Sequence, residues 1–184
     1  MRSFMLLSLL LCSSLAAAAE KGGADEQDPM AGWAPKKAAN EAQDRKEIDA
    51  LVKAMDAAAR KGDLQAAAAM VDFPVLMVTD DKKGEASAAE WSKEQWLQVM
   101  EPFYKQPLEG KIRHKPTVFL ASDSLATLVD VVTMTVGNKS LTSRNSTVLV
   151  RKDGKWLVKV MMEGGWGDVA SASPKQGQDS ATAK

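Results

Sequence analysis

The sequence predicts a single α+β domain in which helices come first and an antiparallel sheet follows. Apolar residues recur every three or four positions between residues 40 and 61, which is the period of an amphipathic helix. Runs rich in β-branched residues fill most of the stretch from 112 to 163. The dipeptides Gly137-Asn138 and Asp153-Gly154 interrupt these runs and are typical of tight hairpin turns. Helices followed by hairpin-linked strands indicate an α+β architecture.

Length and charge limit the function classes. The chain has 184 residues, of which 45% are apolar and 26% charged, and this composition is typical of one globular domain. Its 24 Lys and Arg residues equal its 24 Asp and Glu residues. Because nucleic-acid-binding proteins normally carry a basic excess, we expect no nucleic-acid partner.

Residues 1–19 have the order of a secretory signal peptide. Arg2 precedes an apolar run from Phe4 to Leu15, and small residues end at Ala19 before the charged Glu20. The run is shorter than the roughly 20 residues that a membrane-spanning helix needs. We therefore expect cleavage after Ala19, export to the periplasm or the medium, and no membrane attachment afterwards. The only cysteine, Cys12, lies inside this segment, so the mature chain would have no thiol.

The rest of the chain divides by composition. Residues 20–37 mix Gly, Asp, Pro and Lys without periodicity and predict a flexible lead-in. Residues 38–169 carry the patterned sequence of the domain, and the polar residues 170–184 predict a disordered tail.

Three helices are expected in the first half of the domain. The first spans residues 40–61 and ends at Gly62, and the second spans 64–70 behind Asp63 as its N-cap. A short strand over 73–79 and a polar loop over 80–89 follow. Ser92 and Gln95 then have the spacing of a capping box for a third helix, which ends near Pro102.

Four strands are expected over 112–121, 125–136, 141–152 and 155–163. Two-residue turns would fix their register so that Asp130 faces Asn145, Asn145 faces Met162, and Arg144 faces Glu163. The Asp130 face is otherwise apolar, with Leu128, Val132, Met134, Leu141, Leu149, Trp156, Val158 and Val160.

Asp130 is the informative residue of this face, because an unpaired carboxylate among apolar side chains is costly. It is expected either to accept hydrogen bonds, for instance from Asn145, or to line a wet cavity. His114, the only histidine, falls one diagonal away on the same face if the turn at 122–124 has three residues. A two-residue turn would place His114 on the other face. Tyr104, near the end of the third helix, could also donate a hydrogen bond into a pocket.

Three segments resemble the SnoaL-like, nuclear-transport-factor-2-like (NTF2-like) superfamily. They are Lys61-Gly62-Asp63-Leu64, Phe73-Pro74-Val75 and the closing hairpin from Arg151 to Val158. The resemblance implies a cone, in which a strongly bent sheet wraps against helices around a pocket. Isomerase-like members of the superfamily use a tyrosine on the first helix, and Met55 stands near that position here.

We therefore expect an exported domain that binds a small apolar ligand or a protein partner without catalysis, through Asp130, Asn145, Trp156 and Met162. One alternative is an isomerase, cyclase or hydratase in which Asp130 or His114 moves a proton, with Tyr104 as a further candidate. Another is a scaffold that forms a homodimer, as is common in this superfamily. One histidine and no mature cysteine predict no metal site, and no glycine-rich phosphate loop predicts no nucleotide cofactor.

Overall fold

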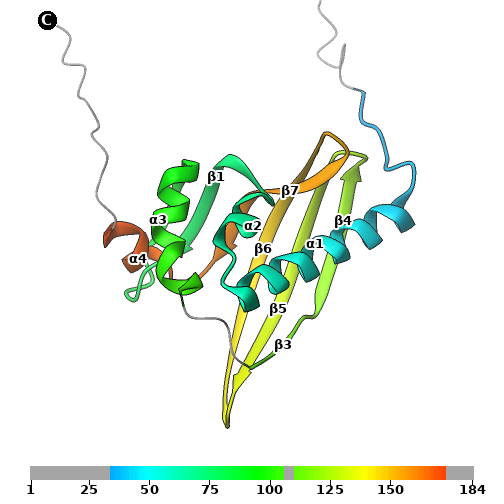
Figure 1. Cartoon of the computed structure of the whole chain (residues 1–184). Coiled ribbons are helices and arrows are strands. Elements are labelled where there is room, and N and C mark those ends of the chain that lie inside the picture. Colours follow the sequence, from blue (N-terminus) through cyan, green and yellow to red (C-terminus); the bar gives the residue numbers. More distant parts are fainter. Residues whose placement is uncertain (1–33, 106–109, 173–184) are drawn as a thin grey trace, which may run out of the picture. The chain divides into compact units, whose positions relative to one another are not determined.

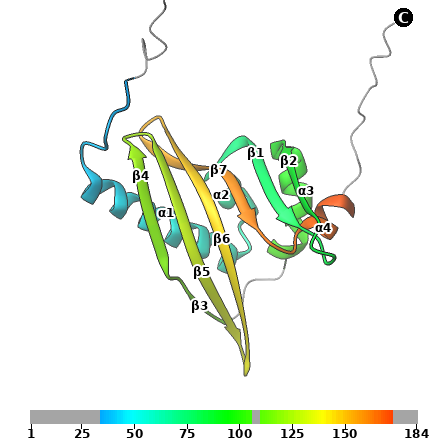
Figure 2. The ribbon, with the colours of Figure 1, turned by 180° about the vertical axis from the view of Figure 1, so that it is seen from behind.

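The structure is a computed structural model that describes residues 34–105 and 110–172. The expected signal peptide and nearly all of the lead-in and the tail lie outside these residues. Helices cover one face of a single curved sheet (Figures 1 and 2), which confirms the α+β prediction. In chain order the elements are α1 (Glu41–Lys61), α2 (Leu64–Ala68), β1 (Val71–Asp80), β2 (Ala86–Trp91), α3 (Lys93–Tyr104), β3 (Lys111–Arg113), β4 (Pro116–Ser122), β5 (Leu125–Val136), β6 (Lys139–Lys152), β7 (Lys155–Glu163) and α4 (Gly167–Ala172).

The helix ends follow the capping residues that the sequence offers. The Asn40 side chain accepts a hydrogen bond from the Gln43 amide at the start of α1, and Gly62 ends this helix in the left-handed conformation. Asp63 caps α2 through the Ala66 amide. Both bonds of the capping box between Ser92 and Gln95 are present at the start of α3.

The sheet has the strand order β2-β1-β7-β6-β5-β3, and β4 also pairs with β5. Strands β4 to β7 form the expected antiparallel meander, whereas β1 runs parallel to β7. Two strand predictions were wrong. The polar loop expected over 80–89 includes β2, which pairs with β1, and the strand expected over 112–121 is broken at His114 and Lys115.

The predicted register holds on one side of β6 and fails on the other. Asp130 pairs with Asn145, as expected. Strand β7 bulges after Val158, however, so Asn145 faces Glu163 and Ser146 faces Met162. The expected pairings of Asn145 with Met162 and of Arg144 with Glu163 were therefore wrong.

The bulge exchanges two methionines between the faces of the sheet. Met161 packs against the core, whereas Met162 is 51% exposed. Helix α1 crosses the concave face of the sheet (Figure 1), and the core lies between them, around Ile48, Leu149 and Val158.

The chain continues beyond β7 into helix α4, where the sequence predicted the end of the domain and the beginning of the tail. Gly165 donates its amide to the Asp80 carboxylate and Trp166 donates its amide to the Thr79 hydroxyl, at 2.7 and 2.9 Å. The ring of Trp166 also packs edge-on against Phe103 of α3. These contacts tie the segment after β7 to β1 and α3.

Candidate functional site

His114 lies at the break between β3 and β4 and joins two carboxylates from different elements. Its Nδ1 lies 2.5 Å from Oδ2 of Asp130 on β5, and its Nε2 lies 2.9 Å from Oδ2 of Asp56 on α1. We call these three residues the Asp56–His114–Asp130 chain. The structure brings His114 and Asp130 together by another route than the expected three-residue turn. The turn has two residues, Asp123 and Ser124, and a bulge at Ala121 shifts the register of β4 and β5 by one, so Pro116 pairs with Asp130.

Asp130 is 3% exposed, and its two carboxylate oxygens have different partners. Oδ2 contacts His114, and Oδ1 accepts the Lys115 backbone amide at 2.9 Å. Asn145 is its cross-strand neighbour, but within residues 34–105 and 110–172 no hydrogen bond joins their side chains. The His114 ring and the Lys115 amide, which lie at the break between β3 and β4, thus stabilise this buried carboxylate in place of Asn145.

The two carboxylates raise the pKa of His114. Burial of the ring lowers the pKa of His114, but the hydrogen bond to Asp130 and the negative charge of Asp56 raise that pKa by more, so it lies above the ordinary value of 6.5. A charged imidazole has N–H donors at both nitrogens, which suits an acceptor on each side. Both donors of His114 are therefore used within the chain of three residues.

Asp56 connects this chain to a cavity of about 250 Å³ between α1 and the sheet. Its apolar walls come from α1, β3, β5 and β6, and its polar groups are two carboxylates and one hydroxyl. The lining residues are Asp56, Ala59, Ile112, Val132, Met134, Leu141, Ser143 and Glu163.

The other residues that the sequence proposed do not line this cavity. Tyr104 packs against the core at the end of α3, and burial raises the pKa of its hydroxyl. Trp156 lies in the core under Arg151, and Met162 lies on the opposite face of the sheet. Asn145 neighbours Asp130 and Glu163 in the sheet without lining the cavity.

Sequence reasoning missed Asp56 and Glu163. Asp56 follows Met55, and its approach to His114 depends on how α1 crosses the sheet. Glu163 faces the cavity only because β7 bulges. A carboxylate within the apolar period of α1 was the one signal that could have indicated Asp56.

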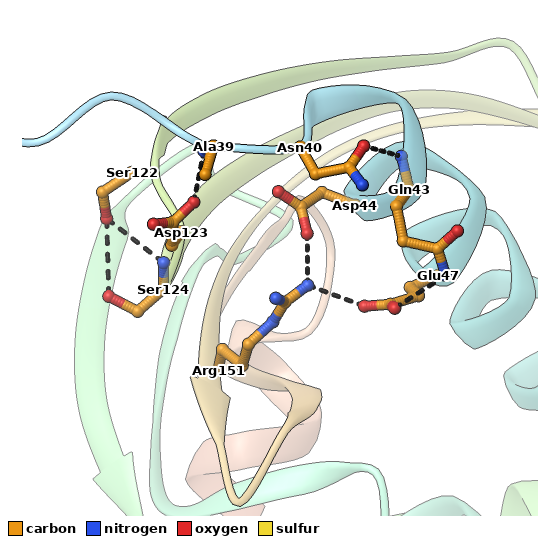
Figure 3. Close-up of polar contacts among 9 residues, drawn as sticks. All are labelled: Ala39, Asn40, Gln43, Asp44, Glu47, Ser122, Asp123, Ser124 and Arg151. Atoms are coloured by element: carbon orange, nitrogen blue, oxygen red, sulfur yellow. Dashed lines mark hydrogen bonds and ion pairs between the residues drawn. The ribbon is translucent and has the colours of Figure 1, made fainter.

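A second charged cluster lies at the other end of α1 (Figure 3). Arg151 on β6 forms ion pairs with Asp44 and Glu47, the latter at 2.6 Å, and its guanidinium stacks on Trp156 at 4.6 Å. Asp44 is 2% exposed. Because Arg151 on β6 pairs with two carboxylates of α1, this cluster attaches the first half of α1 to the sheet.

A groove of about 430 Å³ adjoins this second cluster, between α1, α2 and the β6–β7 hairpin. Glu47 and Trp156 contribute to its lining, but Glu47 is already paired with Arg151. The cavity beside Asp56 is therefore the stronger candidate for a functional site.

The described residues were also considered as metal ligands and as membrane-spanning helices. Within the described residues, no group of three or more His, Cys, Asp or Glu side chains is arranged to hold a metal ion. No helix in the same part of the chain is long and apolar enough to cross a membrane.

Comparisons with known proteins support the fold. No protein-family model matches the chain, and no curated protein matches it. Among solved structures, an NTF2-like protein of unknown function from Shewanella oneidensis is 14% identical with a TM-score of 0.55, over 66% of this chain and 98% of that chain. A scytalone dehydratase-like protein from Novosphingobium aromaticivorans is 12% identical with a TM-score of 0.55, over 67% and 85% of the two chains.

An NTF2-like protein of unknown function from Pseudomonas putida is 17% identical with a TM-score of 0.54, over 66% of this chain and 86% of that chain. The class of protein that these similarities define is a fold class. The chain has an NTF2-like fold, as its resemblance to that superfamily predicted.

Proposed function

We propose that this protein binds a small, mainly apolar molecule in the cavity between α1 and the sheet. The observation that carries the proposal is the Asp56–His114–Asp130 chain, which ends on the wall of a cavity lined mainly by apolar side chains. Ligand sites are typically concave and apolar with a few fixed polar groups. At about 250 Å³ the cavity suits a molecule below drug size.

The three-residue chain supports a binding role because it fixes the direction of the Asp56 carboxylate. Asp56 is a helix side chain with 30% exposure, and a free carboxylate there would change rotamers. The bond to His114, which Asp130 holds in turn, removes that freedom before a ligand arrives. Preorganised polar groups bind more tightly because less entropy is lost on binding.

The proposed ligand contacts differ from those that the sequence analysis expected. Asp130 orients His114 behind the wall of the cavity, and Asp56 supplies the contact at its surface. Apolar contacts would come from Val132, Met134 and Leu141 in place of Trp156 and Met162.

The same geometry favours a second candidate, an acid–base enzyme of isomerase, cyclase or hydratase type. Asp56 would accept a proton from a bound substrate, and the charged His114 would stabilise the carboxylate or return the proton. Asp130 would act as a positioning residue, because its two oxygens face His114 and Lys115.

We also propose that a second copy of the chain covers the outer face of the sheet. One row across the strands carries Leu76, Val160, Val148 and Phe119, and the next row carries Val78, Met162 and Val129. Phe119, Val129 and Met162 are 67%, 48% and 51% exposed. Polar residues interrupt both rows, because Thr127 lies between Val148 and Phe119 and Ser146 lies between Met162 and Val129. Large exposed apolar side chains grouped on one face are nevertheless typical of protein interfaces.

Export remains a further part of the proposal. Its support is the charged start, apolar run and small residues of positions 1–19. The compartment would be the periplasm or the medium.

The test of ligand binding is native mass spectrometry of the protein purified gently from its own host. Ala59→Leu narrows the cavity from α1, whereas Ala57→Leu makes the same change at an exposed position of the same helix. We expect a co-purifying molecule of small mass in the wild type and in Ala57→Leu, and its loss in Ala59→Leu. A molecule retained equally by both variants would place binding elsewhere.

A further inference from the structure

The polar lining of the cavity beside Asp56 consists of hydrogen-bond acceptors. Its ionisable groups are Asp56 and Glu163, and Ser143 adds one hydroxyl. No Lys or Arg side chain is among the described residues that line it. The guanidinium of Arg60, on the last turn of α1, donates to the Gly110 carbonyl at 2.9 Å.

His114 cannot supply the missing donor. Its two ring nitrogens already face Asp130 and Asp56, and the carboxylates outnumber the imidazole in the group of Asp56, His114, Asp130 and Glu163. The negative charge of the cavity is therefore only partly balanced from within the described part of the chain.

Glu163 is the carboxylate of the cavity that has no partner among the described residues. It is half-buried at the end of β7, opposite Asn145, and no hydrogen bond or ion pair involves its side chain among residues 34–105 and 110–172. Asp56 uses Oδ2 for His114, and no described group donates to its Oδ1. Carboxylates in an apolar surrounding are costly unless a donor meets them.

We infer that the ligand is a small organic cation, an amine on an apolar body, whose ammonium group binds between Asp56 and Glu163. This inference rests on the proposed function, because it names the chemical class of ligand for the same cavity. The hydrocarbon part contacts Val132, Met134 and Leu141, and the ammonium group supplies the donors that the cavity lacks. Hydrogen bonds between charged partners are roughly twice as strong as neutral ones. A carboxylate ligand is excluded by repulsion.

Three probes of nearly equal size separate these possibilities: cyclohexylmethylamine, cyclohexylmethanol and cyclohexanecarboxylate. Their binding to the mature chain is followed at neutral pH by methyl NMR of the methionines. Met134 lines the cavity, and Met134→Leu identifies its signal among the methionines of the mature chain. This signal reports binding at the cavity itself.

We expect the amine to shift the Met134 signal with an affinity at least roughly tenfold above that of the alcohol, and the carboxylate to cause no shift. Glu163→Gln should weaken amine binding by about three- to tenfold and leave alcohol binding unchanged. Glu90→Gln, the same change at an exposed position on β2, should alter neither affinity.

Two results would overturn the inference in different ways. Binding of the alcohol or the carboxylate as tightly as the amine would refute the cationic ligand while leaving the cavity a binding site. A Met134 signal that none of the probes moves would contradict both the ligand class and the proposed function.

Discussion

At His114 a single imidazole connects helix α1 to strand β5, through Asp56 and Asp130. His114 lies between the end of β3 and the start of β4, outside both strands. From there its ring contacts both Asp56 and Asp130. Sequence pairing placed His114 near Asp130 because both depend on one local hairpin. Asp56 could not be predicted in the same way, because its place depends on packing between distant elements.

Asp130 supports the site from behind, and its replacement should cost stability. Asp130→Asn keeps an acceptor for the Lys115 amide but removes the charge that faces His114. We expect a loss of about 1.5–3 kcal/mol in the free energy of unfolding, measured by urea denaturation. Asp49→Asn, which breaks an exposed pair with Lys53, should cost less than about 1 kcal/mol. Equal losses in the two variants would contradict the buried role of Asp130.

The raised pKa of His114 makes the free energy of unfolding depend on pH, and its contribution falls as the pH rises. Because the folded protein holds the pKa of His114 above 6.5, its contribution is fully present below pH 6.5 and is lost as the pH rises through the folded-state pKa. The difference in unfolding free energy between the wild type and His114→Gln should therefore shrink from pH 6 to pH 9. A difference that grows over this range would show that the sign is wrong.

At the scale of elements, the sequence predicted the features that depend on neighbouring residues. The helix caps at Asn40, Asp63 and Ser92 and the turn at Asp153-Gly154 depend on neighbouring residues. The bulge after Val158 coincides with a register shift in the parallel pairing of β7 with β1, a distant strand, and the positions of the hairpin turns do not predict it. Strand β2 is mostly exposed and alanine-rich, so it lacks the alternation that predicts a strand.

The junction between α1 and α3 depends on the absence of a side chain at Gly62. This residue has φ of +68°, and a Cβ there would lie 2.6 Å from the Tyr104 carbonyl oxygen. Gly84 has φ of +81° with open space around it. Gly84→Ala should cost about 1–2 kcal/mol, the left-handed penalty alone, and Gly62→Ala should cost more. Thermal or urea unfolding of both variants tests this order, which equal losses would contradict.

At the scale of the whole molecule, the two faces of the sheet have different tasks in this account. The concave face packs on α1 and holds the cavity, and the convex face carries the apolar rows around Phe119 and Met162. Period and turns predicted the α+β class, because they define the elements, and the resemblance to the NTF2-like superfamily implied the cone. It predicted the cavity lining poorly, because the lining combines residues from α1 to β7.

If a second copy covers the convex face, a charged side chain placed in its apolar rows should disrupt the dimer. Phe119→Lys places a cation in the row between β4 and β7, and we expect monomers by sedimentation or native mass spectrometry. Val136→Lys, also an exposed apolar position but outside the two rows, should leave the dimer intact. A wild-type chain that is monomeric at micromolar concentration would refute this interface.

Export predicts a defined mass for the mature protein. Intact mass spectrometry of the chain from its own host should show loss of residues 1–19, with Glu20 as the new N-terminus. Recovery of the protein with these residues attached would contradict the signal peptide.

His114 bridges two carboxylates at the wall of the cavity, and its imidazole can be observed directly. The sequence holds one histidine, so ¹⁵N NMR of the untagged chain gives a single pair of ring signals. A pH titration should show a pKa above 6.5 in the wild type and a lower pKa in Asp56→Asn. A ring that titrates at or below 6.5, with no response to Asp56→Asn, would contradict the account.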